Sequence, residues 1–272
     1  MIRLGHIDYS NCIPVHALLL ERPPAGVALM RDIPSRLNAA LAAGVIDAAP
    51  CSSIEYARHA ADYRILPAHA IGSAGAVQSI LLETTVPPER LAGLEVAVPT
   101  ASATSVVLLR ALLELRLGVR PRYRWFEQGS ADPIETGAAA ALRIGDVALT
   151  RVAPPGRLVL DLGAEWFAWT GLPFAFAVWQ VRRAVPAADV RALVELLGES
   201  RAWWAADPAA HARRHAPHFG LTPERLLDYW ASLRFDLDAA MQRGLLHFYD
   251  LAAELGEAPR TGALDIVPVG QD

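Results

Sequence analysis

The sequence contains no lysine, and all of its basic residues are arginines. This absence excludes chemistry that needs a lysine amine, namely Schiff-base formation, pyridoxal attachment and the phosphate-binding lysine of a P-loop. A GC-rich coding bias is the simplest reason for it, and the exclusion holds whatever the reason. With a net charge of −4 and scattered arginines, the chain also lacks the basic patch that indicates a nucleic-acid partner.

Cysteine and long hydrophobic runs are scarce as well. The only cysteines are Cys12 and Cys51, and no apolar run approaches the roughly 20 residues of a membrane span. Arg3, His6 and Asp8 interrupt the N-terminus, so we expect no signal peptide. These features predict a cytoplasmic protein without membrane contact, in which both cysteines stay reduced.

Common catalytic and cofactor motifs are missing. The chain has no Gly-x-Ser-x-Gly elbow, no Gly-rich phosphate loop and no Cys–His spacing typical of zinc. His211 and His215 are four residues apart and can share a helix face, but no third ligand is evident. The sequence therefore predicts neither a metal nor a cofactor.

Short apolar runs alternate with helical periodicity along the chain, which is typical of an α/β protein with largely parallel sheets. The expected strands are 2–8, 27–32, 45–50, 76–83, 94–99, 122–126, 141–149, 159–161 and 174–181. From Pro186 onward proline and glycine separate helices only, which we expect at about 187–205, 208–216, 223–231 and 237–255.

This order of elements predicts two lobes with a ligand cleft between them, as in type II periplasmic binding proteins. The strands 76–83 and 174–181 are the expected crossovers. The first lobe would comprise 1–83 plus 182–272, and the second would be inserted over 84–181.

Polar, uncharged residues stand where three expected strands lead into helices. Helix N-termini offer free N–H groups and a positive dipole end, so they can bind a carboxylate without a basic side chain. Serine, threonine and asparagine also cap helices routinely, and each segment alone is explained as well by capping. Because all three would meet at one cleft, we expect a ligand site, with these contact residues: Ser10, Ser52, Ser53, Ser102, Thr104 and Ser105.

Two more polar positions lie on expected strands. Gln78 and Ser79 interrupt an apolar strand, which indicates either an exposed face or a ligand contact. Asp146 ends another strand, where its carboxylate is either structural or an acceptor for a substrate hydroxyl. The aromatic stretch Asp161–Trp179 carries three tryptophans with Gly171 and Pro173, and it indicates an enclosed region.

Together these residues resemble the chorismate dehydratases of the futalosine route to menaquinone. The resemblance covers about two thirds of the chain, from Gly5 to about Trp179. Its motifs are Asn11-x-x-Pro14, Gly44-x-Ile-Asp47, Pro50-x-Ser-Ser-x-Glu-Tyr56, Val77-x-Ser79, Ser102-x-Thr-Ser105, Ile144-Gly-Asp146, and Asp161-Leu-Gly-x-Glu-Trp166 through Thr170-Gly-Leu-Pro-Phe174.

The resemblance implies a two-lobed periplasmic-binding-protein-like fold and conversion of chorismate to 3-[(1-carboxyvinyl)oxy]benzoate and water. With no obvious general base in the motifs, we expect the substrate's enolpyruvyl carboxylate to take the proton, oriented by Asn11 and Ser79. Asp146 or His6 as a conventional base is the alternative. Thr170 and Gly171 would present N–H groups to the ligand.

The aromatic residues Trp166, Trp169 and Phe174 would either wall the cleft or pack between the lobes. Two other functions remain open, the 1,4-dihydroxy-6-naphthoate synthases that share this fold, and a non-catalytic protein that binds small carboxylates. The start Asp8–Pro14 departs from the Ser-Pro-Cys-Pro-Asn-Asp pattern of those synthases, which favours the dehydratase. The apolar stretch 106–115 fits a core helix and a homodimer face equally well.

Overall fold

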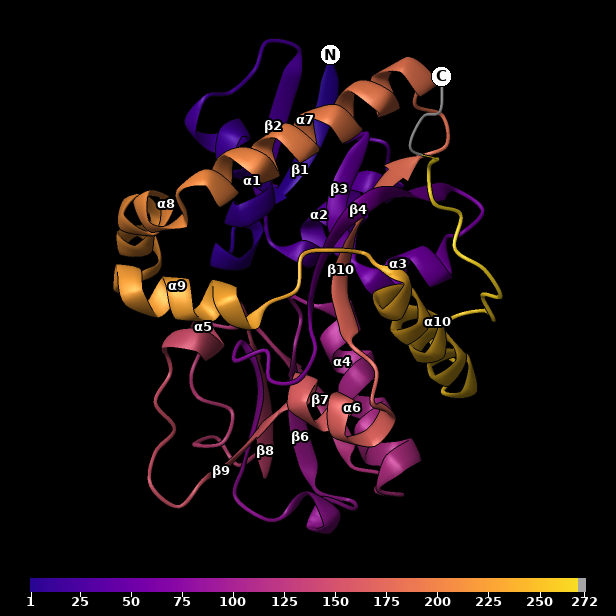
Figure 1. Cartoon of the computed structure of the whole chain (residues 1–272). Helices are drawn as coiled ribbons and strands as arrows, with labels where there is room; N and C mark the ends of the chain where they lie inside the picture. The colour runs from indigo at the N-terminus through magenta and orange to yellow at the C-terminus, as the bar shows by residue number, and fades with distance from the viewer. Residues whose placement is uncertain (269–272) are drawn as a thin grey trace.

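Two five-stranded sheets form the centres of two lobes in the computed structural model, which describes residues 1–268 (Figure 1). The strands are β1 (Ile2–Ile7), β2 (Val27–Asp32), β3 (Ala48–Ser52), β4 (Tyr63–Ser73), β5 (Ile80–Thr84), β6 (Glu95–Pro99), β7 (Arg122–Phe126), β8 (Ala140–Ile144), β9 (Leu158–Asp161) and β10 (Phe174–Arg182). The α-helices are α1 (Ile13–Glu21), α2 (Pro34–Ala42), α3 (Ser53–Arg58), α4 (Ala103–Arg110), α5 (Gly145–Thr150), α6 (Leu162–Thr170), α7 (Ala187–Ala206), α8 (Pro208–His215), α9 (Pro223–Ser232) and α10 (Ala239–Glu254).

Short 3₁₀ turns and one π-helical segment complete the described secondary structure. They are η1 (Ser10–Cys12), η2 (Pro88–Arg90), the π-helical η3 (Ala111–Arg116), which continues α4, and η4 (Ala216–Phe219).

The first sheet has the order β2-β1-β3-β10-β4. Strand β1 runs parallel to β2 and β3, whereas β10 is antiparallel to both of its neighbours. Every residue of β3 is buried, and β10 is buried from Phe174 to Val181, as expected for strands covered on both faces. Helix α2 packs beside β3, α10 beside β10, and α7 along α1.

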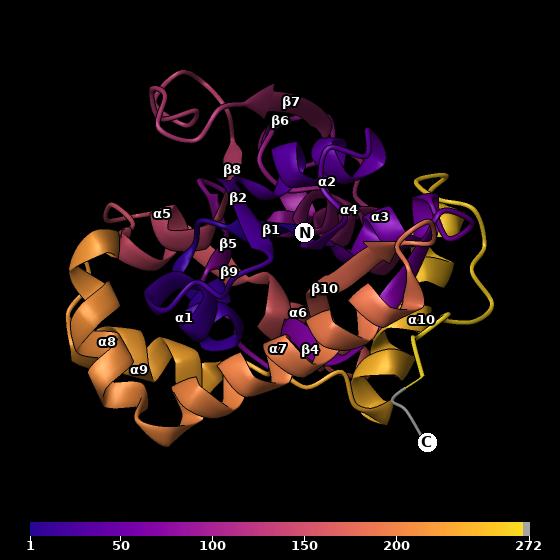
Figure 2. The same cartoon turned by 90° about the horizontal axis from the view of Figure 1, so that it is seen from above.

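The second sheet has the order β7-β6-β8-β5-β9, with β6 parallel to β7 and β8 and with β5 antiparallel to β8 and β9. The chain enters this sheet through the segment 74–79 and leaves it between α6 and β10. Figure 2 shows the helices α7, α8 and α9 bordering the molecule along one side when it is seen from above. The two-lobed α/β architecture that the sequence predicts is confirmed.

The change of sheet occurs earlier at both junctions than the expected lobe limits of 84 and 181. Strand β5 pairs with β8 and β9, and therefore lies in the second sheet. Strand β10 pairs with β3 and β4, and therefore lies in the first sheet. An apolar run indicates that a strand exists but does not say which strands it pairs with.

The strands expected at 45–50 and 76–83 are shifted, to 48–52 and 80–84, and three further elements differ from those that the sequence predicts. Strand β4 was not expected, because Pro67 and Gly72 interrupt its pattern; it pairs with β10 through register shifts, and Ala68 has a φ of 68°. The strand expected at 141–149 ends at Ile144, and α5 follows. Helix α6 forms inside the aromatic stretch. Gly171 does not interrupt it, because Gly171 lies just beyond its end, where a φ of 68° closes the helix.

The sequence-based expectations for the last third of the chain and for the cysteines are confirmed. Helices α7 to α10 begin and end within two residues of the predicted bounds. Cys12 and Cys51 are free and buried. No helix within residues 1–268 is long and apolar enough to cross a membrane. In the apolar stretch 106–115, Val106–Leu109 and Ala111–Leu113 are buried in the core.

Candidate active site

A cavity of about 440 Å³, open solvent included, lies where the two lobes meet. Residues of the first lobe supply part of its lining, and residues of the second lobe supply the rest. The lining consists of Ile7, Tyr9, Asn11, Pro34, Ser52, Ile71, Ser79, Ile80, Ser102, Ser105, Ile144, Gly145, Phe176 and Ala177. None of these side chains carries a charge.

Five of the predicted site residues line this cavity. Asn11 lies in the 3₁₀ turn after β1, and Ser52 is the last residue of β3. Ser79 directly precedes β5, while Ser102 and Ser105 lie at the start of α4. Asn11, Ser52, Ser102 and Ser105 lie where a strand leads into a helix, which is where open α/β sheets bind ligands. Ser79 lies on the connection between the two sheets.

The serines of α4 combine capping with access to the cavity. The Ser102 Oγ accepts a hydrogen bond from the Ser105 N–H at 3.4 Å, and the two hydroxyl oxygens lie 3.0 Å apart. Capping and ligand contact are therefore not exclusive here, because both side chains also line the cavity.

Asn11 and Ser79 come together around a buried tyrosine that the sequence did not indicate. The Tyr229 hydroxyl, on α9, donates to the Ser79 Oγ at 2.7 Å, and the Asn11 side chain lies beside the same hydroxyl. Burial raises the pKa of Tyr229, so it remains a donor. The buried Asn11 Oδ1 has no hydrogen-bond partner among the described residues. No sequence pattern relates position 229 to positions 11 and 79.

Ser10 and Asp146 lie just behind the lining and join the lobes to each other. Asp146 accepts hydrogen bonds from the Ser10 N–H, at 3.1 Å and 3.3 Å to its two oxygens, and from the Ser10 hydroxyl. Burial raises the pKa of the Asp146 carboxyl, and the bonds from Ser10 oppose that rise. Neither residue lines the cavity, because the Ser10 donors and the Asp146 carboxylate are hydrogen-bonded to each other. Their placement differs from their expected role as substrate contacts.

Ser53 and Thr104 form a second polar contact between the lobes. Their hydroxyl oxygens lie 3.3 Å apart, and the Thr104 Oγ1 also accepts from the Ile54 N–H at 3.1 Å. The threonine thus caps α3 from the other lobe. Neither residue is among those that line the cavity, and the contacts of both hydroxyls join the two lobes. Their expected contact with a ligand stays a prediction.

Gly145 allows the closest approach of the lobes at the cavity. Its φ is 63°, and a Cβ atom built there would lie 2.9 Å from the Tyr9 ring. Both the backbone conformation and the contact therefore require glycine at this position.

The acidic end of the Asp161 motif holds the crossover that carries Ser79. The Asp161 carboxylate caps α6 by accepting from the N–H groups of Gly163 and Ala164. It also accepts from Val77 at 3.0 Å and from Gln78 at 2.6 Å, and Ser79 is the next residue. The motif thus positions a cavity residue without itself lining the cavity.

The aromatic half of that motif is a core, which agrees with packing between the lobes, one of the two alternatives that the sequence left open. Trp166 is fully buried, and its ring lies 5.0 Å from Phe174, 6.1 Å from Trp169 and 6.3 Å from Phe248 of α10. None of the four lines the cavity; Phe176 does. The rings fill the space between α6, β10 and α10, where they bury more apolar surface than at a solvated cleft.

Thr170 and Gly171 also lie outside the cavity, contrary to expectation. The Gly171 N–H donates to the Phe167 carbonyl at 2.8 Å, and the Thr170 Oγ1 accepts from the Leu172 N–H. These groups close the C-terminus of α6 and are not free to bind a ligand.

His6, the other proposed base, faces a buried cluster and not the cavity. Its Nδ1 lies 3.0 Å from the Nδ1 of His16. Burial lowers the pKa of His6 to about 3, so the ring is neutral. A neutral ring outside the lining has no direct path to a bound substrate.

The two lobes and their sheets have the fold of the periplasmic binding proteins. The chain is similar to a solved protein of Archaeoglobus fulgidus, at a TM-score of 0.80 and 19% identity over 94% of this chain and 97% of that one. It is also similar to the periplasmic aliphatic sulphonate binding protein SsuA of Escherichia coli, at a TM-score of 0.64 and 16% identity over 99% and 94% of the two chains.

The sequence also matches a family model described as menaquinone biosynthesis, over residues 2–254. It is 33% identical over 262 residues to a chorismate dehydratase of Thermus thermophilus, which covers 90% of this chain and 93% of that protein. The chain therefore belongs to the menaquinone-biosynthesis family that includes this dehydratase, and the resemblance of the motifs is confirmed.

Proposed function

We propose that the protein is a chorismate dehydratase, a hydro-lyase that converts chorismate to 3-[(1-carboxyvinyl)oxy]benzoate and water in the futalosine route to menaquinone. Its 33% identity to a protein of that name supports the proposal. The observation that carries it is the cavity between the lobes, whose lining offers hydroxyls, an amide and a helix start but no charged group.

This lining suits a substrate with two carboxylates and a ring. Ser52, Ser102 and Ser105 offer hydroxyl donors, and the start of α4 adds the positive end of a helix dipole. Apolar side chains flank these donors, so a ring held between them is shielded from water. Fixed donors in a dry site stabilise charge more strongly than water does, which positions the substrate for one reaction.

The reaction breaks the C3–H bond and the C4–O bond of chorismate. The electron pair of the C3–H bond forms the new ring double bond, the C4 hydroxyl leaves, and the proton from C3 completes the water. Aromaticity provides the driving force, so the enzyme needs mainly to hold the geometry and to place a proton acceptor.

We assign the proton acceptor to the enolpyruvyl carboxylate of the substrate, held by Asn11 and Ser79. The lining contains no carboxylate or histidine, and burial raises the pKa of its Tyr9 to about 12, so that phenol stays protonated. Asp146 and His6 are both occupied behind the lining, by Ser10 and His16 respectively. Tyr229 donates to the Ser79 Oγ, which leaves the Ser79 hydrogen free to point into the cavity.

Incubating the purified protein with chorismate tests the activity. Following ring absorbance and product mass should reveal 3-[(1-carboxyvinyl)oxy]benzoate in the wild type. Asn11→Ala should lower kcat by about 100-fold, in the range for loss of a positioned catalytic group, while Ser130→Ala, in the exposed loop after β7, should act as wild type. Absence of turnover would refute the proposal and leave a binding protein or a naphthoate synthase.

A chorismate analogue without the enolpyruvyl carboxylate tests the proton acceptor. We expect it to bind and not to lose water. Dehydration at an unchanged rate would show that another group takes the proton.

A further inference from the structure

Two groups of three side chains in the described part of the chain have the composition of a metal site. One is His6, Cys12 and His16; the other is Glu21, His211 and His215. In each group the possible ligand atoms all lie within 4.8 Å of one another. Neither group lines the cavity, so each can be judged apart from the proposed reaction.

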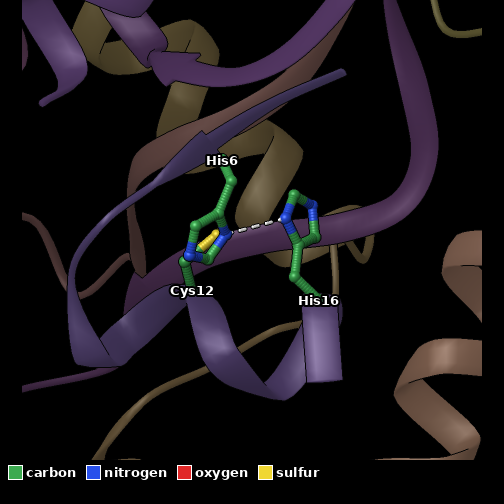
Figure 3. Close-up of side chains that lie close together, drawn as sticks. All are labelled: His6, Cys12 and His16. Atoms are coloured by element: carbon green, nitrogen blue, oxygen red, sulfur yellow. Dashed lines mark hydrogen bonds between the residues drawn. The ribbon is translucent and has the colours of Figure 1, made fainter. Parts of the chain in front are cut away.

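The first group is engaged in an internal chain of hydrogen bonds. The Trp179 Nε1–H donates to the His16 Nε2 at 2.9 Å, and tryptophan can only donate. The neutral His16 ring must therefore carry its hydrogen on Nδ1, which faces the His6 Nδ1 at 3.0 Å (Figure 3). That nitrogen has no lone pair for a metal, so both ring nitrogens of His16 are used in buried hydrogen bonds and neither can bind an ion.

The second group joins two distant helices. Glu21 is the last residue of α1, while His211 and His215 are one turn apart on α8. The Glu21 Oε1 lies 2.7 Å from the His211 Nδ1 and 2.9 Å from the His215 Nε2. The glutamate is 190 residues away from His211 along the chain, which is why the sequence offers no third ligand.

Neighbouring groups orient the side chains of His211 and Glu21, so that the His211 Nδ1 and the Glu21 Oε1 face each other. The His211 Nε2 donates to the Trp203 carbonyl at 3.3 Å, so Nδ1 is the nitrogen left for Glu21. The Trp203 ring packs edge-on against the His211 ring at 4.8 Å. Arg214 holds the other glutamate oxygen, Oε2, at 2.8 Å. A histidine bonded through its far nitrogen to a backbone carbonyl is the usual arrangement of a metal ligand.

Oxygen acceptors face both nitrogens of His211. A neutral ring has one N–H group, and here that group donates a hydrogen bond to the Trp203 carbonyl. The lone pair of Nδ1 then points at a carboxylate oxygen, and only a cation between them, a proton or a metal ion, makes that contact favourable.

We propose that Glu21, His211 and His215 bind a divalent transition-metal ion, with zinc matching two imidazoles and one carboxylate best. Tetrahedral bonds of about 2.1 Å would set the ligand atoms about 3.4 Å apart. The contact of Glu21 with His215 therefore needs to widen by about 0.5 Å, and its contact with His211 by about 0.7 Å. Water would fill the fourth position, on the side of the partly exposed His215.

The bound ion would tie α8 to the end of α1. Helix α9 packs on α8 and supplies Tyr229 and Trp230, which donate to the Ser79 Oγ and to the Ser10 carbonyl. The metal would thus stabilise the helical layer that supports the cavity, without contacting a substrate.

The test titrates the metal-free full-length protein with zinc against a chelating dye. The wild type should bind one equivalent and gain a few degrees in Tm. Glu21→Gln and His215→Gln should each bind at least about tenfold more weakly and show no gain in Tm. The matched controls are His218→Gln, an exposed histidine just beyond α8, and Cys12→Ser in the first group; both should bind as the wild type.

Cobalt provides an independent reading of the ligands. The cobalt form should show the visible bands of a tetrahedral nitrogen and oxygen site, without the near-ultraviolet band of a thiolate. The proposal is overturned if the wild type binds no zinc, if both Glu21→Gln and His215→Gln bind normally, or if Cys12→Ser abolishes binding.

Discussion

The side chains at the cavity divide into those that are free to meet a ligand and those that are used by the protein itself. Asn11 keeps a buried oxygen that has no partner within residues 1–268, and Ser79 keeps a hydrogen because Tyr229 occupies its lone pair. Ser10 and Asp146 are bonded to each other. Residue type does not separate these two sets, since both contain serine; the hydrogen-bond partners do.

Tyr229→Phe should lower kcat by about tenfold with little change in KM, because the Ser79 hydroxyl loses the donor that orients it. Steady-state kinetics with chorismate measure the effect. Tyr56→Phe is the control, since it also removes one hydroxyl from a buried tyrosine, in this case an acceptor from the Asp265 N–H at 2.7 Å. Equal losses in both variants would mean that the change reflects stability alone.

Gly145→Ala should lower both stability and activity. The positive φ costs about 1–2 kcal/mol for a residue with a Cβ, and the new methyl group would displace the Tyr9 ring from the cavity lining. Gly156→Ala is a matched control, because Gly156 has a φ of 85° but nothing within 4 Å of the added atom. Urea unfolding should show similar losses for both variants, and only Gly145→Ala should raise KM.

At the scale of elements, the site depends on helices that contribute no lining residue. Helix α9 contacts the crossover and the first lobe through Arg225 to Gln78, Tyr229 to Ser79 and Trp230 to Ser10. The cap of α6 holds the same crossover through Asp161. Helix α9 and the start of α6 therefore hold the proposed site residue Ser79 in place, although neither helix lines the cavity.

Asp161→Ala should cost about 2 kcal/mol or more, since it removes a helix cap together with the bonds to Val77 and Gln78. It should also lower kcat, because Ser79 follows directly. The control Asp238→Ala removes the cap of α10, where the carboxylate accepts from the Met241 N–H at 2.8 Å. That variant should lose about 1 kcal/mol in urea unfolding and keep its kcat; a normal kcat in Asp161→Ala would contradict the role of the cap.

Local signals explain which elements the sequence predicts well. Proline and glycine mark the ends of α7 to α10, and those bounds are predicted within two residues. Strand β4 was missed because its bulges accommodate Pro67 inside a paired strand. Ser52, Ser102 and Ser105 were predicted from strand ends and helix starts, and Ser79 from a polar pair in an apolar strand. The partners of Ser10 and Glu21, by contrast, are 136 and 190 residues away, and no local pattern encodes such pairs.

Across the whole molecule, the buried histidines His6, His16 and His69 make stability depend on pH. Burial lowers the pKa of His6 to about 3 and that of His69 to about 4, and it lowers the pKa of His16 well below its ordinary value. The unfolded chain takes up protons near pH 6.5 and the folded chain does not. Stability from these groups is therefore complete above pH 6.5 and declines as the pH falls toward 4.

Urea unfolding at pH 7, 6 and 5 should show this decline, with up to about 1.4 kcal/mol per pH unit for each histidine. His69→Phe keeps a ring beside Trp179 and removes one titrating group, so its slope should be about one third smaller. An unchanged slope in that variant, or a stability that rises toward pH 5, would contradict the assignment.

A binding cavity without charged side chains also determines how a dianion arrives. With a net charge of −4 and no cation in the lining, the protein offers no long-range attraction to such a substrate. Association should therefore proceed without electrostatic steering, and kcat/KM should vary less than about twofold between 50 and 500 mM salt. An enzyme built this way would work equally well at low and high ionic strength, at the cost of a slower first encounter.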